Sequence, residues 1–211
     1  MNYGYLTHQN TGHNGFISWV CMPGSPRLAV SFLGILKCFV GNVSLMGKMN
    51  LLYVPLAAII PLLTGGIWYS KPVFGRIWMR ASGMSEENAH RKMLLVFGLT
   101  YLVSLFLAFG LLPVVIHQFG VFGVLANEPG INDPSSEMGR YLGDFMTKYG
   151  TNFRTFRHGA FHGSLTGLFI AMPVVATIAL YEGKKFRYVA VHAGYWILTL
   201  ALMGGVLCAF V

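Results

Sequence analysis

Charged side chains are scarce in this sequence. Only 15 of its 211 residues are Lys or Arg and only 7 are Asp or Glu, which makes 10% charged residues, where soluble globular chains have about 25%. A soluble domain with so few charges would expose large apolar patches. The composition therefore excludes a disordered chain, a coiled coil and a collagen-like fibre, and a hydrophobic content of 55% favours a polytopic membrane protein.

Cysteine is scarce as well, and the usual export signal is missing. The three cysteines, Cys21, Cys38 and Cys208, show no CxxC or Cys/His metal spacing, and an odd number argues against a disulfide framework. The first twenty residues lack the basic start and apolar block of a secretory signal peptide. The net charge of +8 forms no basic stripe, so we predict no nucleic-acid partner.

The chain contains several long apolar runs. Four of them reach the length of about 20 residues that a bilayer demands of a helix. They are too long for barrel strands and lack the alternation of such strands, so only helix can satisfy their backbone in lipid. The sequence therefore predicts an all-α polytopic membrane protein with four transmembrane helices, over about residues 51–69, 93–116, 159–181 and 188–211.

The distribution of Lys and Arg predicts the orientation in the membrane. Loops 70–92 and 182–187 together carry eight of these residues, whereas loop 127–157 has equal numbers of basic and acidic residues and the C-terminus has neither Lys nor Arg. Positive charge collects on the cytoplasmic side. We therefore expect loops 70–92 and 182–187 in the cytoplasm and loop 127–157 and the C-terminus outside, although Lys48 counts against this orientation.

Two loops show the periodicity of amphipathic helices. One follows the first span, with Pro72 suited to open it and Gly83 to end it, and Ser85 then reads as the N-cap of the next helix. Its basic face and its apolar face with a Trp suit a lipid headgroup surface. The other covers residues 138–149 and ends at Gly150. It either lies on the outer membrane surface or covers the helical bundle.

Residues 1–48 differ from the rest of the chain. They are polar and Gly-rich up to Pro26, and the apolar run that follows is interrupted by Lys37. A Lys at the centre of a span costs about 2.5–3.5 kcal/mol on insertion scales, so we predict no fifth span. We expect a poorly ordered or weakly apolar N-terminal extension before the membrane domain 49–211. Because Met49 opens a cleaner membrane protein, a start codon assigned too early is our hypothesis, which the intact mass of the native product would test.

The end of the first predicted span carries a recognisable motif. The stretch GGIWYSKPVFGRIWMR and the two His-Gly pairs between His158 and Gly163 resemble the bacterial membrane family catalogued as domain of unknown function 1761, over roughly Met49 to Val211. The resemblance implies membrane location and four spans, but no activity, substrate or assigned site. The middle loop is longer than in that pattern. The motif residues are Trp68, Tyr69, Ser70, Pro72, Phe74, Gly75 and Trp78, and the aromatic residues among them suit an interfacial belt.

Histidines near the ends of spans are the residues best suited to chemistry. His158 and His162 are four residues apart and share one helix face, and His117 ends the second span on the same side of the membrane. Such a set can present several imidazoles to one metal ion. His192, of order 20 Å away in depth, does not join them. A fourth ligand would be an oxygen donor such as Asn152 or Gln118. The alternative is that each His bonds a neighbouring helix or a headgroup.

A glycine face lies on the same predicted helix as two of the histidines. Gly159, Gly163 and Gly167 recur every four residues, which lets another helix approach closely. The groove serves either packing within the bundle or a homodimer. The small-residue pairs that could meet it on the fourth span are Ala190 with Gly194 and Ala201 with Gly205.

These observations favour a non-enzymatic membrane protein, a small helical bundle that packs with itself or with a partner. The alternative is a transporter or channel for a small solute or ion, in which the histidines and the prolines inside spans take part. An enzyme with a His-bound metal is the third hypothesis, and the predicted spans lack the carboxylate that it would need. We predict no cofactor and expect the lipid bilayer to surround the protein. The sequence does not identify a small-molecule ligand.

Overall fold

The computed structural model describes residues 49–84 and 93–211. All of these residues belong to one compact unit, Lys48–Val211. The expected N-terminal extension 1–48 and the expected N-cap at Ser85 lie outside the described residues.

The first half of the described chain forms short helices followed by one long helix. Helices α2 (Tyr53–Ala57) and α3 (Ile60–Trp68) occupy the first predicted span, and a π-helical turn, η1 (Lys71–Gly75), leads into α4 (Arg76–Ser82). Pro72 lies in the first turn of η1, and Gly83, with a left-handed φ of 74°, ends α4, as the sequence predicted. Helix α6 (Met93–Val115) is the second predicted span.

The second half contains the outer-loop helix and the last two spans. Helix α7 (Gln118–Leu125) is followed by α8 (Glu137–Tyr149), which is the predicted amphipathic helix. The hydroxyl of Ser136 caps α8 by accepting a hydrogen bond from the Gly139 amide. Helix α9 (Phe156–Thr166), the π-helical turn η2 (Gly167–Ala171) and α10 (Met172–Tyr181) form the third predicted span. Helix α11 (Phe186–Phe210) is the fourth.

Within residues 49–84 and 93–211, three helices are long and apolar enough to cross a membrane: Met93–Val115, Phe156–Tyr181 and Phe186–Phe210. The first predicted span meets these criteria only when Tyr53–Trp68 and Lys71–Ser82 count as one span, and the two halves of that pair are bent by 54°. The described residues form no strand, so the all-α prediction is confirmed, with three spans or four. The bend separates α4 from the apolar helices before it.

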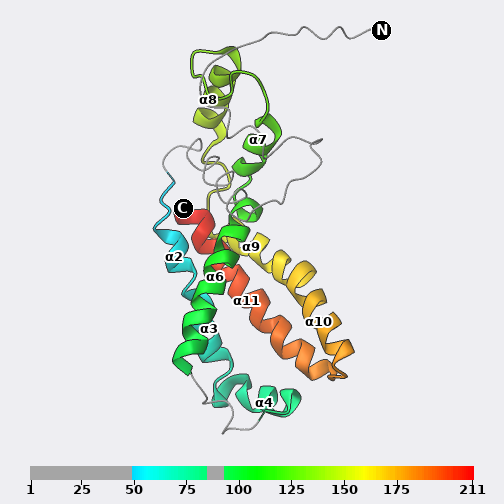
Figure 1. Ribbon diagram of the computed structural model, residues 1–211. Helices are drawn as coiled ribbons and strands as arrows, with labels where there is room; N and C mark the ends of the chain where they lie inside the picture. Colours follow the sequence, from blue (N-terminus) through cyan, green and yellow to red (C-terminus); the bar gives the residue numbers. More distant parts are fainter. Residues whose placement is uncertain (1–48, 85–92) are drawn as a thin grey trace, which may run out of the picture. The chain divides into compact units, whose positions relative to one another are not determined.

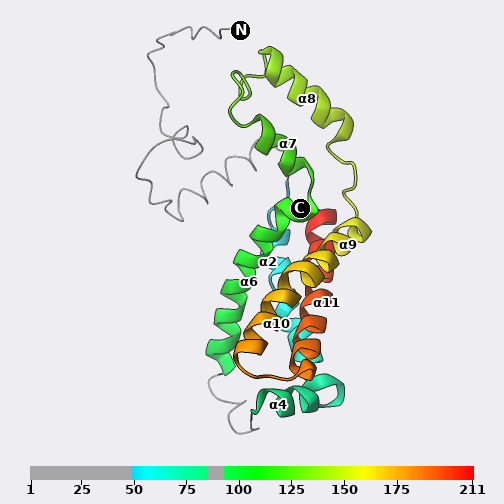
Figure 2. The same ribbon diagram turned by 90° about the vertical axis from the view of Figure 1, so that its right-hand side faces the viewer.

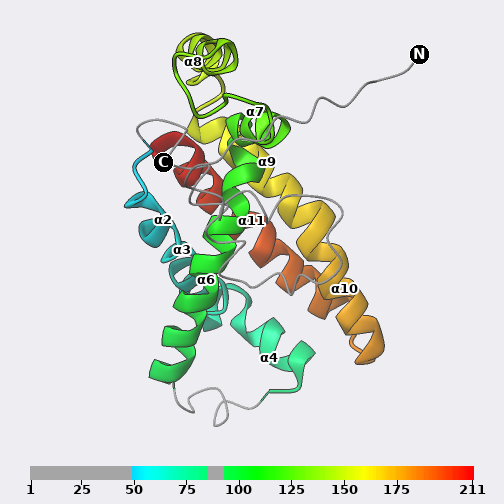
Figure 3. The ribbon, with the colours of Figure 1, turned by 45° about the horizontal axis from the view of Figure 1, so that its top comes forward.

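Helix α11 lies at the centre of the bundle. It packs against α9 and α10 on one side and against α2, α3 and α6 on the other (Figure 3). Half of its most apolar stretch is buried, compared with 17% for α6 and for the third span. Large apolar side chains of α6 and of the third span stay exposed, such as Leu94 at 89% and Phe169 at 69%. Such surfaces suit contact with lipid.

The two ends of the bundle carry different elements. Helix α4 lies at one end and α7 and α8 at the other (Figures 1 and 2). At the α4 end, the Lys184 ammonium donates to the carbonyl of Ser82 at 3.1 Å, which brings the first and third loops together. At the opposite end, the amide of Asn50 donates to the carbonyl of Val211 at 3.0 Å. Successive spans therefore run in opposite directions, as a polytopic membrane protein requires.

The glycine face of α9 lies directly against α11. A side-chain carbon on Gly159 would collide with the carbonyl of Gly204, one on Gly163 with the carbonyl of Leu200, and one on Gly167 with the backbone of Ile197. The three glycines therefore permit a backbone-to-backbone approach within one chain. A homodimer through the same face would have to displace α11.

The strip on α11 that meets these glycines agrees only in part with the pairs expected from the sequence, because Ala201 contacts Gly163 as expected and Gly194 and Gly205 have other neighbours. Gly194 lies against the ring of Trp68, and Gly205 lies against the ring of Phe156. The observed strip runs through Ile197, Leu200, Ala201 and Gly204. The small residues at 194 and 205 mark close approaches of aromatic rings, which the sequence pattern alone does not distinguish from helix packing.

Candidate metal centre

Three histidines come together where α6 ends and α9 begins. Helix α6 ends at Val115 and α7 begins at Gln118, so His117 stands in the connection between them. Helix α9 starts behind its N-cap Thr155, whose hydroxyl oxygen accepts a hydrogen bond from the amide of His158 at 3.3 Å. His162 follows one turn later, so both imidazoles face the same way.

The imidazoles of His117, His158 and His162 form a tight group. Their ligand nitrogens all lie within 4.8 Å of one another. The Nε2 atoms of His117 and His158 are 2.9 Å apart. The ring of His117 stands nearly perpendicular to the other two, at centroid distances of 4.8 Å and 4.7 Å. His117 is exposed and the other two are partly buried, so the group is open to ions from outside the bundle.

The spacing is close to what a metal ion requires. Zinc lies about 2.0–2.1 Å from a histidine nitrogen in a tetrahedral site, which places two such nitrogens about 3.3 Å apart. The observed upper limit of 4.8 Å therefore closes by about 1.5 Å at most. Among the described residues, the group contains imidazoles and no carboxylate.

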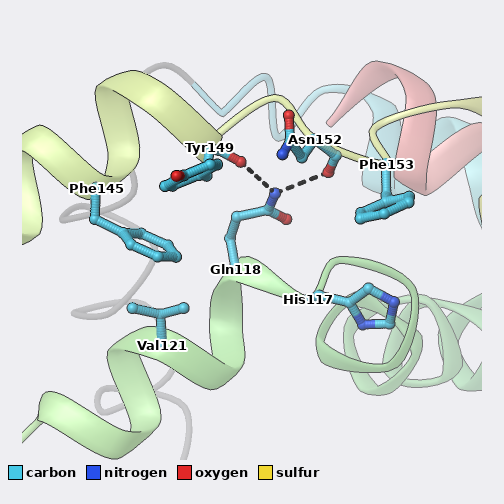
Figure 4. Close-up of a pocket in the computed structure, with 7 residues that line it drawn as sticks. All are labelled: His117, Gln118, Val121, Phe145, Tyr149, Asn152 and Phe153. Carbon is cyan, nitrogen blue, oxygen red and sulfur yellow. Dashed lines mark hydrogen bonds between the residues drawn. The ribbon is translucent and has the colours of Figure 1, made fainter.

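The two expected oxygen donors lie beside this group. Gln118 is buried, and its Nε2 donates to the carbonyl oxygens of Asn152 at 3.0 Å and Tyr149 at 3.3 Å (Figure 4). These bonds fix the segment that follows α8 over the beginning of α7. Gln118 thus holds the outer loop beside His117, a structural role that the sequence did not predict.

Arg154 attaches the same segment to the end of α11. Its Nε donates to the carbonyl of Cys208 at 3.0 Å. Burial lowers the pKa of the Arg154 guanidinium from its usual value, but an arginine remains protonated in proteins. The thiol of Cys208 donates in turn to the carbonyls of Val115 and Phe153, at 3.2 Å and 3.3 Å. The segment before α9 is therefore tied to α6 and α11, which positions the histidines.

His192 lies apart from the group, in a polar network that the sequence did not predict. Its Nδ1 is 2.8 Å from the hydroxyl of Tyr69. One turn further along α11, the hydroxyl of Tyr195 donates to the carbonyl of Pro61 at 2.9 Å, and the hydroxyls of Thr199 and Thr64 are 2.8 Å apart. The spacing of residues 192, 195 and 199 on one helix face is the feature that could have revealed the network.

The aromatic motif after the first span builds the bend rather than a ligand site. The indole N–H of Trp68 donates to the carbonyl of Val191 at 3.0 Å, and its ring lies 4.4 Å from that of Phe74. The ring of Tyr69 contacts Trp78 at 5.2 Å. Gly75 packs so closely on the carbonyls of residues 69 and 70 that no side chain fits. The sequence suggested an interfacial belt for these aromatic residues and did not predict their contacts within the bundle.

The family follows from a comparison with known proteins. The chain matches the family described as Protein of unknown function (DUF1761) over residues 52–208, which is most of its length. It belongs to this family. No curated protein and no solved structure matches the chain. Because the match covers the aromatic motif and the histidine group, both lie within the DUF1761 region, and the suspected resemblance is confirmed.

Proposed function

We propose that this DUF1761 protein is a non-enzymatic integral membrane protein that binds a divalent transition-metal ion at the α7 end of its helical bundle. The observation that supports the proposal is the convergence of three imidazoles from two connected parts of the chain, with all ligand nitrogens within 4.8 Å. Neutral imidazole suits Zn²⁺, Cu²⁺, Ni²⁺ and Co²⁺. Three protein ligands leave one position of a tetrahedral ion open.

A metal ion accounts for the arrangement better than packing does. Two neutral imidazoles can share one hydrogen bond, as the 2.9 Å contact between His117 and His158 allows. His162 takes no part in that bond. Its position one turn after His158 places its ring 4.5 Å from that of His158, and the same ring lies 4.7 Å from that of His117. An ion accepts a lone pair from each ring at once.

The chemistry of the group supports binding rather than catalysis. A hydrolytic zinc site needs a general base, usually a carboxylate, beside the metal-bound water. The group holds three histidines without Asp or Glu among the described residues. We therefore propose a role in holding or sensing an ion. Transport is the alternative. In the π-helical interruption of the third span, however, Gly167 packs against Ile197 and the next three side chains are exposed and apolar, which suits contact with lipid better than a polar pathway.

We also propose that the histidine group faces outward across a bacterial cytoplasmic membrane. Loops 70–92 and 182–187 carry the excess of Lys and Arg, which favours the cytoplasmic side. Their described parts meet at the α4 end, where Lys184 donates to the carbonyl of Ser82. The histidines lie at the junction of α6 and α7 and at the start of α9, and these elements meet at the opposite end of the bundle from α4 (Figures 1 and 2). The ion would then come from the extracytoplasmic space.

Cobalt substitution tests the metal site directly. The detergent-purified chain should bind one Co²⁺ with the visible absorption of a low-coordinate nitrogen-ligated ion. His117→Ala should weaken binding by at least tenfold, because loss of a ligand costs no less than loss of a supporting contact. His192→Asn is the matched control, since it removes a histidine outside the group. Equal binding by wild type and His117→Ala, or no cobalt spectrum in the folded wild type, would refute the proposal.

A further inference from the structure

A pocket of about 280 Å³ adjoins the three-histidine group and shares His117 with it. Its other walls are largely apolar, with Val121 from α7 and Phe145 and Tyr149 from α8 (Figure 4). The ring of Phe153, which also lines the pocket, lies 5.1 Å from the ring of His158. The pocket and the histidine group are therefore neighbours through two separate residues.

A buried acceptor without a donor lies in the pocket wall. Gln118 is only 6% exposed, and its Nε2 is engaged by two carbonyls of the loop above. Its Oε1 is buried and has no hydrogen-bond partner among the residues that the structure describes. Figure 4 shows this oxygen on the side of the amide toward His117 and Phe153. Since an unsatisfied buried acceptor is unfavourable, it marks the place where the N–H of a ligand would belong.

The backbone at Phe153 is held in an unfavourable conformation beside the same pocket. Its φ is +61°, which is rare for a bulky side chain. Such conformations persist where the surroundings impose them, and they concentrate at binding sites. Here the carbonyl of Phe153 accepts from the amide of Thr155 at 2.9 Å. The strain fixes an aromatic ring between the pocket and His158.

We infer that the pocket binds a small, flat, apolar molecule whose head group combines a metal-binding atom with an adjacent N–H. The head would fill the open coordination position of the ion, its N–H would donate to Gln118 Oε1, and its apolar body would lie among Phe145, Tyr149 and Phe153. The volume of about 280 Å³ fits one ring and its head group. The inference rests on the proposed metal site and names the ligand class of that site.

Three related hydroxamates test the inference on the Co²⁺-loaded full chain in detergent. Each chelates the ion in the same way, and titration of the cobalt absorption measures its affinity. Benzohydroxamate carries both the ring and the N–H, acetohydroxamate lacks the ring, and N-methylbenzohydroxamate lacks the N–H. We expect benzohydroxamate to bind at least tenfold more tightly than acetohydroxamate, because its ring is buried. We expect the N-methyl compound to bind about fivefold to tenfold more weakly than benzohydroxamate.

A pair of variants on α8 assigns the ring to the pocket. Phe145→Ala should remove the preference for benzohydroxamate over acetohydroxamate and leave Co²⁺ affinity unchanged. Tyr141→Ala, on the same helix but 60% exposed and outside the pocket lining, should keep the preference. A normal cobalt spectrum with equal affinity for all three probes would overturn the pocket inference and leave the metal site standing. A folded protein without a cobalt spectrum would overturn both.

Discussion

Individual glycines determine how closely helices α9 and α11 approach each other. Gly163 faces the carbonyl of Leu200 and the Cα of Ala201, so an added methyl group meets backbone that cannot rotate away. Gly110 on α6 is exposed and has no heavy atom within 4 Å of the place where a side chain would begin. The same substitution therefore has opposite consequences at the two positions.

We predict that Gly163→Ala destabilises the bundle by about 1–3 kcal/mol, because overpacking of a tight interface outweighs the helix propensity gained. Gly110→Ala should be neutral or slightly stabilising. Thermal unfolding of both variants in the same detergent measures the difference. An unchanged midpoint for Gly163→Ala would show that α9 and α11 do not pack as described.

The residues of the candidate site differ in how far the sequence reveals them. The four-residue spacing placed His158 and His162 on one face, and the end of an apolar run placed His117 at a similar depth. No sequence pattern predicted the buried position of Gln118 or the left-handed backbone of Phe153. Both depend on how the outer loop folds back over α7, which involves contacts between residues far apart in the chain.

At the scale of helices, apolar length predicted the long elements well. The structure has helices Met93–Val115 and Phe186–Phe210 where the sequence predicted spans 93–116 and 188–211, because the apolar run itself defines a span. The breaks inside the first and third spans were not predicted. Pro61 lies in the first turn of α3 and Pro173 in the first turn of α10, directly after these breaks. Each proline marks the place, but a proline inside an apolar run does not by itself distinguish a break from a kink.

The bend after the first span depends on one glycine in the aromatic motif. Gly75 lies against the carbonyls of Tyr69 and Ser70, and its own amide donates to the Ser70 carbonyl at 2.9 Å. We predict that Gly75→Ala opens the 54° bend and lowers stability by about 1–3 kcal/mol. Tryptophan emission should shift to the red, because Trp68 and Trp78 lose their partners Phe74 and Tyr69.

The matched control for the bend is Gly66→Ala. Gly66 lies in α3, two residues before Trp68, with open space where its side chain would begin. This variant should retain the wild-type emission and midpoint. If Gly75→Ala behaved in the same way, the motif would not be what turns the chain.

At the scale of the whole molecule, the two ends of the bundle have different chemistry. One end has basic loops and a half-buried aromatic bend, and the other has the histidine group beneath an amphipathic helix. Helix α11 joins them: its network of Tyr195 and Thr199 holds α3, and its C-terminal turn holds the loop before α9. Under the proposed function, the bundle supports a metal site at one face of the membrane.

The metal content of the purified protein tests this account most directly. We predict about one equivalent of a divalent transition metal per chain after exposure to a Zn²⁺-containing buffer and removal of unbound ions. The folded double variant His158→Ala/His162→Ala should retain none. Stoichiometric metal in both proteins, or in neither, would contradict the account and reduce the histidines to packing residues.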